Sequence, residues 1–184
     1  MRTGLLLIIL FGFVSGCSQT ETGPKWSDFE SKDGGIRASL LCTPKERIKS
    51  FQDQPRPIHI YSYECESNGI RFLLSVKNHQ NDFNAKTIDE SFESNEFLLK
   101  SMFGEVEKFS ARKDFTTNGF ASRDYDMELK AGGKVRALIV VNEFATYEAL
   151  IGVTQDNLEI IVQKKLDFKS ISDKFIGSVE ILKK

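Results

Sequence analysis

The sequence of 184 residues has almost no excess of charge of either sign, because 25 Lys and Arg residues are balanced by 26 Asp and Glu residues. A domain that binds nucleic acid usually carries a basic patch or a clearly basic composition. The balance therefore argues against nucleic acid as a partner. The composition is otherwise typical of a globular protein, with 40% hydrophobic residues, and the length fits one domain.

Residues that carry chemistry are also scarce. The chain has two histidines, His59 and His79, and three cysteines, and neither type occurs with the HxxxH or CxxC spacing of common metal sites. It contains no GxSxG nucleophile elbow, no GxxxxGK[ST] phosphate loop and no GxGxxG dinucleotide fingerprint. We therefore expect no bound metal, no cofactor and a domain without catalytic activity.

A segment long enough to cross a membrane is missing as well. The run from Leu5 to Val14 is apolar apart from Gly12, but ten residues make a helix of about 15 Å, half of a hydrocarbon core of about 30 Å. The run follows Arg2 and precedes a polar stretch. It therefore fits the apolar region of a signal peptide better than a buried core helix.

The run ends at Val14-Ser15-Gly16-Cys17, which resembles the lipobox of bacterial lipoproteins: an aliphatic residue, two small residues and a cysteine. The resemblance implies that residues 1–16 are a signal peptide and that Cys17, the new N-terminus, carries a diacylglycerol thioether. The chain would then be anchored to a membrane outside the cytoplasm. Ser18, where an Asp tends to retain Gram-negative lipoproteins at the inner membrane, implies the outer membrane facing the periplasm if the source is Gram-negative. An ordinary secretory signal is the alternative.

The two remaining cysteines, Cys42 and Cys65, are an even pair in a compartment that the signal implies is oxidising. A disulfide between them would close a loop of about 23 residues and stabilise the fold by about 3 kcal/mol. Two buried free thiols are the alternative. We expect the disulfide.

The rest of the chain divides into a short tether and one domain. Residues 17–25, the lipidated cysteine and a polar stretch with Gly23 and Pro24, form the tether, and residues 26–184 form the globular domain.

Alternating apolar residues predict strands at 36–40, 58–65, 70–77, 106–117, 121–129, 135–141 and 144–153. Asn68-Gly69 and Asn118-Gly119 predict tight turns between strands. Pro44 to Pro57 holds three prolines and is predicted to be a loop.

Two helices are expected. Thr87 and Glu90 fit a capping box at the start of the first, whose apolar face includes Phe92 and Leu99, and Gly104 is a natural stop. Ser170 to Gly177 is the second, while residues 158–162 are compatible with either strand or helix. The order predicts an α+β fold, in which helices pack on a largely antiparallel sheet.

The two ends of the domain resemble the PsbP-like family of small α/β sandwiches. The resemblance is carried by Trp26-x-x-Phe29 with Asp33-Gly34-Gly35-Ile36 at the start and by Lys174-Phe175-Ile176-Gly177-Ser178-Val179 at the end, and it covers roughly residues 26–182. The family implies an accessory or assembly role rather than catalysis.

Four residues are the candidates for chemistry. His79 lies with Asp82 in a polar run, where a loop histidine could act as a base. Asp124 and Asp126 project from one face of a strand at about 7 Å, a separation that suits two-carboxylate hydrolysis. We favour a solvated outer face for this pair, with Tyr125 and Met127 packed on the inner face.

The expected function is a membrane-anchored lipoprotein of the bacterial cell envelope with a non-catalytic binding or accessory domain. Its expected partners are membrane lipid, through acylated Cys17, and envelope proteins. Two other functions stay open: an envelope hydrolase that uses His79 or the Asp124/Asp126 pair, and a carrier for a hydrophobic ligand in a cavity between helix and sheet. The 15 Phe residues would allow such a cavity an apolar lining.

Overall fold

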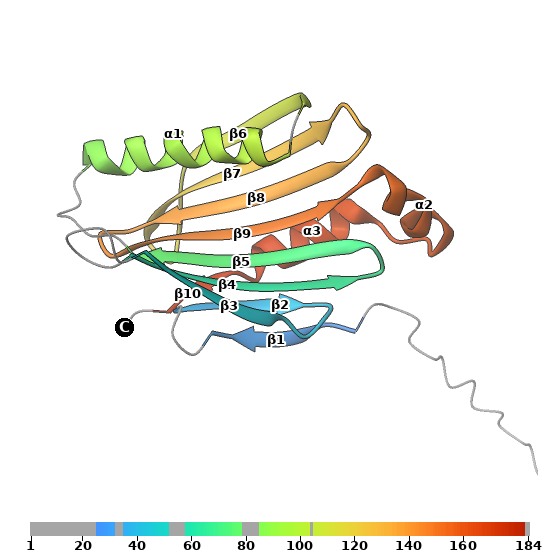
Figure 1. Ribbon diagram of the computed structural model, residues 1–184, viewed down its shortest axis with the longest axis horizontal. Helices are drawn as coiled ribbons and strands as arrows, with labels where there is room; N and C mark the ends of the chain where they lie inside the picture. The colour runs from blue at the N-terminus through green and yellow to red at the C-terminus, as the bar shows by residue number, and fades with distance from the viewer. Residues whose placement is uncertain (1–24, 32–34, 52–57, 79–84, 104, 183–184) are drawn as a thin grey trace, which may run out of the picture.

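A seven-stranded antiparallel sheet forms the centre of the molecule in the computed structural model, which describes residues 25–31, 35–51, 58–78, 85–103 and 105–182. Its strands follow the order β3-β4-β5-β9-β8-β7-β6 (Figure 1). Their bounds are Lys45–Phe51 for β3, Ile58–Ser67 for β4, Ile70–Asn78 for β5, Val106–Thr117 for β6, Phe120–Leu129 for β7, Lys134–Val141 for β8 and Ala145–Val153 for β9. The strand signals in the sequence are thus confirmed for six of these seven strands.

Two Asn-Gly turns fix the register of two hairpins. Asn68 and Gly69 join β4 to β5 with φ values of 53° and 78°, and Asn118 and Gly119 join β6 to β7 with 52° and 84°. Positive φ at both central residues matches the right-handed twist of the flanking strands, and Asn-Gly tolerates it best. Both turns were predicted, and both are confirmed.

A smaller sheet packs across one face of the large one. It contains β1 (Ser27–Glu30), β2 (Ile36–Leu40) and β10 (Glu180–Ile181) in the order β1-β2-β10. Alternate residues of β2 are buried, so Ile36, Ala38 and Leu40 pack into the main core. The last strand therefore closes on the first part of the domain, because Glu180 and Ile181 of β10 pair with Arg37 and Ile36 of β2.

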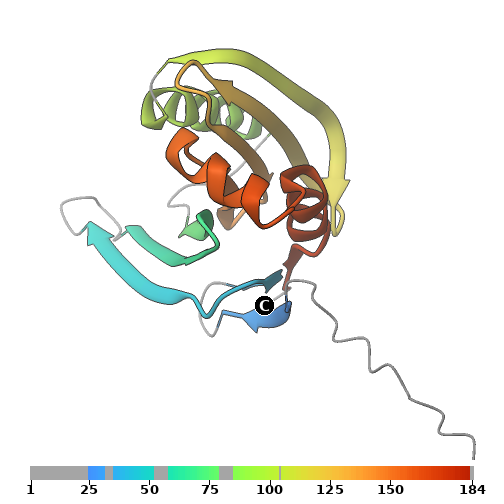
Figure 2. The ribbon, with the colours of Figure 1, turned by 90° about the vertical axis from the view of Figure 1, so that its right-hand side faces the viewer.

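Three helices cover the two faces of the large sheet. The first, α1 (Ala85–Met102), packs on one face through Phe92 and Leu99, in a cluster with Tyr125 and Met127 of β7. The other two, α2 (Gln155–Gln163) and α3 (Phe168–Gly177), lie on the opposite face with the small sheet, where Phe175 is fully buried. The two views agree on this division (Figures 1 and 2). We call the two sides of the large sheet the α1 face and the α3 face.

The fold class is the α+β arrangement that the sequence predicts, with helices on antiparallel sheets. Leu158 to Val162, for which strand and helix stayed open, belongs to α2. None of the helices in the described ranges is long and apolar enough to cross a membrane. Cys17 and the tether up to Pro24, together with Gly104, lie outside the described residues.

Two predictions about element bounds were wrong. The segment from Pro44 to Pro57 is not entirely loop, because Lys45–Phe51 forms edge strand β3. An edge strand pairs on one side only and is often rich in charge, so it lacks the apolar alternation by which strands are recognised. In addition, α1 begins at Ala85, which places Thr87 inside the helix rather than at its cap.

Candidate functional site

The carboxylate pair on β7 is part of an ion-pair cluster between the sheet and α3. Arg136 of β8 donates from Nε to Oδ1 of Asp124 at 3.1 Å and from Nη2 to Oδ2 at 2.8 Å. It also bonds Asp173 of α3, which accepts a hydrogen bond from Lys169 at 2.7 Å. Asp124 is 6% exposed, whereas the side chain of Asp126 is 68% exposed. The prediction of a solvated face was therefore right for Asp126 and wrong for Asp124, which α3 helps to cover.

The titration of this cluster follows from its contacts. The hydrogen bonds that Arg136 donates to Asp124 raise the pKa of Arg136 further above its usual range. The hydrogen bond from Lys169 lowers the pKa of Asp173, and desolvation raises the pKa of Asp126. Because Asp124 already receives both arms of a guanidinium, its oxygens are held in a structural contact that joins α3 to the sheet.

Of the two histidines, only His59 lies within the described residues. His79 and Asp82 lie outside the described residues, so their proposed pairing stays a prediction. His59 lies on β4 with its Nδ1 at 2.9 Å from Ser50 Oγ of the edge strand, in an exposed position. This contact pairs two polar groups on the α3 face at the outer edge of the sheet.

An open groove of about 850 Å³ lies beside the C-terminal end of α1. Small-molecule sites commonly have volumes of about 300–1,000 Å³ and mostly apolar walls. The apolar lining of this groove comes from α1, the residue that follows it, and four strands: Met102, Phe103, Leu73, Leu129, Val135 and Leu150. Its charged lining comes from the outer strands: Lys45, Arg47, Glu64, Glu66 and Arg71. The groove therefore has an apolar floor and a charged rim.

The groove exists because α1 is narrower than the sheet beneath it. The cluster under α1 draws its buried residues from β7, β8 and β9, and β5 contributes only the partly buried Leu73. In Figure 1, β3, β4 and β5 extend beyond the helix. The α1 face of these three strands is consequently left open, and the groove follows the line where the cover ends.

Three rows of directly opposed residues cross this open part of the sheet. Opposed residues in an antiparallel sheet carry their side chains on the same face. The rows run from the edge inward as Lys45, Glu64, Leu73 and Leu150; as Arg47, Ser62, Ser75 and Glu148; and as Lys49, Ile60, Lys77 and Thr146. Each row begins with an exposed cation on β3, so the outer edge of the α1 face carries a basic strip of Lys45, Arg47 and Lys49.

The position of α1 is fixed on the side away from the groove. Arg123 of β7 forms an ion pair with Asp89 at 3.0 Å, and Lys100 lies 4.1 Å from the ring centroid of Phe109 on β6. The opposite edge of the helix, which faces the groove, carries Leu98 and Met102, 47% and 63% exposed. Residues four apart lie on one side of a helix. Met102 therefore lines the groove, and the exposed Leu98 lies one helical turn before it on the same side of α1.

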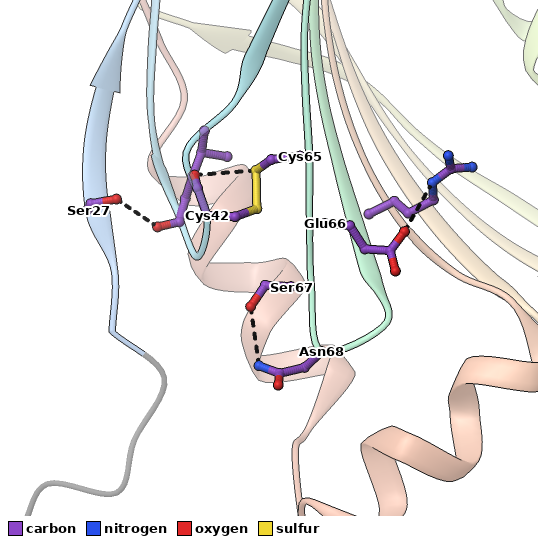
Figure 3. Close-up of a disulfide and its surroundings, with 8 residues drawn as sticks. Ser27, Cys42, Cys65, Glu66, Ser67 and Asn68 are labelled. Carbon is purple, nitrogen blue, oxygen red and sulfur yellow. Dashed lines mark hydrogen bonds and ion pairs between the residues drawn. A yellow bond between two sulfur atoms is a disulfide. The ribbon is translucent and has the colours of Figure 1, made fainter.

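The disulfide secures the wall of the groove. Cys42 and Cys65 are bonded, as predicted, with their Cα atoms 5.9 Å apart (Figure 3). Both border the groove, and the bond ties the connection between β2 and β3 to β4. It thereby fixes the start of the edge strand that carries Lys45.

The same end of the groove is where the described chain begins. Ser27 pairs with Leu40, two residues before Cys42, and its Oγ donates to the Leu40 carbonyl at 3.4 Å. Figure 3 shows Ser27 beside the disulfide. The Trp26 ring packs edge-on against Phe72 at 6.4 Å between centroids, in the core of the α3 face. The start of the domain and the groove therefore lie at the same end of the large sheet but on opposite faces.

A carboxyl group lies further along the same face. Glu148 of β9 lies opposite Ser75 of β5 and two residues before Leu150. Its side chain is therefore on the α1 face, beside the groove. Desolvation raises the pKa of Glu148, while the charge of Lys77 acts in the opposite direction. The next residue on this face, Thr146, lies 3.2 Å from Ser91 Oγ of α1. No pattern in the sequence singles out Glu148, because a single Glu in an apolar strand is recognised as unusual only when the residues that cover it are known.

No protein-family model matches this chain, and no curated protein does either. Within the described ranges, no cluster of three or more His, Cys, Asp or Glu residues could hold a metal ion. A functional proposal for the domain therefore rests on the groove itself and on the lipobox-like pattern from Val14 to Cys17.

Proposed function

We propose that the chain is a membrane-anchored lipoprotein of the bacterial cell envelope, with a non-catalytic binding domain on the extracytoplasmic side. The anchor is supported by the lipobox pattern at Val14-Ser15-Gly16-Cys17. A disulfide between Cys42 and Cys65 is consistent with an oxidising compartment, since such bonds rarely persist in the cytosol. Membrane lipid, through acylated Cys17, is then the first partner.

The observation that carries the binding role is the open groove with its apolar floor. Met102 lines the groove, Leu98 lies on the same side of α1, and both side chains expose apolar surface to water. Exposed apolar surface is unfavourable, and a bound apolar group would cover it. Of the alternative functions, the groove favours a carrier or receptor for a hydrophobic ligand over an envelope hydrolase. The hydrolase alternative has less support, because Asp124 is engaged by Arg136.

Photolabelling tests the groove. The full chain is kept in its native membrane and exposed to a neutral fatty alcohol that carries a diazirine on its acyl chain. We expect the label on peptides that contain Leu73 and Met102, and we expect Met102→Asp to reduce it to background, because a charge placed at an apolar site resists desolvation.

Phe97→Asp is the matched control. Phe97 is 72% exposed on the same helix but is turned by about 100° from its neighbour Leu98, away from the groove. Both substitutions introduce the same charged residue into the same helix. Labelling that is spread evenly over the domain, or that is equally sensitive to both substitutions, would remove the groove as the binding site.

The finer fold assignment is part of the same proposal. We assign the domain to the PsbP-like sandwiches because of the order of its elements. The chain begins with the short strands β1 and β2, continues through the large antiparallel sheet, and ends with α3 and β10. The motifs that carry the resemblance lie in the first and last of these parts. An experimental structure whose strand order departs from that of the family would contradict this assignment.

A further inference from the structure

The charges on the rim of the groove are arranged unevenly. Lys45 stands opposite Glu64, and Arg71 forms an ion pair with Glu66 at 3.6 Å. Arg47 and Lys49, in contrast, stand opposite Ser62 and Ile60. Within the described part of the chain, neither of these two cations has an ion-pair partner. Two exposed cations without an ion-pair partner in the described residues therefore stand side by side on one face: Arg47, which lines the groove, and Lys49 next to it on β3.

These two cations stand at a fixed distance from the apolar lining. Arg47 and Leu73 come from adjoining rows and are separated by two strand spacings, or about 10 Å. Glu148, the carboxyl group in the row of Arg47, is three strand spacings away, about 14 Å. A ligand with an anionic group at one end and an alkyl chain at the other can thus reach both parts while its anion stays clear of the carboxyl group.

We propose that the groove takes an acyl chain of an anionic membrane phospholipid, with the phosphate held by Arg47 and Lys49. The inference rests on the proposed function, because it names the ligand class of the same groove. The chain lies along Leu73, Leu150 and Met102, whose apolar surfaces it covers. The Ser62 hydroxyl, between the cations and the floor, is placed to donate to the same phosphate.

The place of the groove in the domain favours a membrane lipid as the source. Trp26 begins the domain at the same end of the large sheet as the groove, and it follows Cys17 by nine positions. A fully extended chain of that length spans about 30 Å. An anchored domain would therefore hold its groove close to the headgroups of the membrane that carries it.

The test uses the full lipidated chain in phosphatidylcholine vesicles that contain a trace of a phospholipid with a diazirine on one acyl chain. One arm uses a phosphatidylglycerol probe and the other a phosphatidylcholine probe. We expect the phosphatidylglycerol probe to label the groove peptides about thirtyfold more strongly, since two cations near an anionic headgroup contribute about 2 kcal/mol together. Arg47→Gln with Lys49→Gln should remove this preference and leave the labelling by phosphatidylcholine unchanged.

Lys164→Gln with Lys165→Gln is the control for charge alone, because both lysines are exposed and lie at the end of α2 on the α3 face. These substitutions should leave the preference intact. Equal labelling by the two probes, or a preference that both double variants lose alike, overturns the headgroup site while the apolar groove and the proposed function stand. Absence of label from the groove with both probes, or cross-links there between two copies of the chain, overturns the proposed function as well.

Discussion

Asp124 and Asp126 are two residues apart on β7 and point to the same face, yet their surroundings differ completely. The alternation of the strand is visible in the sequence and was read correctly. That α3 covers Asp124 and leaves Asp126 exposed was not visible, because it depends on a helix that follows by more than 40 residues. The burial of single polar residues is thus the part of this structure that sequence patterns predict least well.

This difference makes a matched pair of substitutions. Asp124→Asn should lower the free energy of unfolding by about 3 kcal/mol, because removal of one partner from a buried pair leaves Arg136 poorly compensated. Asp126→Asn should lower it by less than about 1 kcal/mol, because its ion pair with Arg136 is long and exposed. Urea unfolding of both variants measures the effect. Equal losses would contradict the assignment of Asp124 as the structural partner.

Glu148 gives the domain a pH dependence of known sign. Its raised pKa means that the folded state binds protons more tightly than the unfolded state between its ordinary pKa of 4.5 and the raised value. Stability from this group is therefore greatest below pH 4.5 and falls as pH rises through that window.

Glu148→Gln removes the titration. Relative to the wild type, this variant should gain stability between acid and neutral pH, as measured by thermal unfolding at a series of pH values. A wild type and variant whose stabilities run parallel over the whole series would show that Glu148 is ordinarily solvated.

At the scale of elements, the hairpins, the two predicted helices and the meander were predictable because their residues are patterned. Asn68-Gly69 and the alternation from Ile70 to Val76 specify a turn and a half-buried strand without reference to the rest of the chain. The edge strand β3 was missed, because Lys45, Arg47 and Lys49 face solvent and carry no apolar period. The candidate site was missed for the same reason, since one of its walls is this strand.

The disulfide is the element-scale feature that links stability to the groove. Replacement of Cys42 and Cys65 by Ser together should lower the free energy of unfolding by about 3 kcal/mol, the value for a loop closed at a separation of 23 residues. It should also release the start of β3 from β4 and weaken photolabelling of the groove. Unfolding in urea with and without a reductant measures the first effect, and the reductant should leave the Ser variant unchanged. If the wild type unfolds at the same urea concentration with and without the reductant, the disulfide does not stabilise the fold.

At the scale of the whole molecule, the account joins an anchor, a short tether and a groove at one end of the domain. Trp26 begins the domain after the tether and packs against Phe72 in the core of the α3 face, at the same end of the large sheet as the groove. Two or more acyl chains on Cys17 would make the attachment stable, since one chain alone binds a membrane only marginally. The domain would then work within reach of its own membrane.

The mass of the N-terminal peptide from the native membrane tests this account most directly. The account predicts that the peptide begins at Cys17, without residues 1–16, and carries the added mass of a diacylglycerol thioether. A peptide that begins elsewhere, or one with an unmodified Cys17, would contradict the anchor and leave the domain without its proposed place beside the membrane.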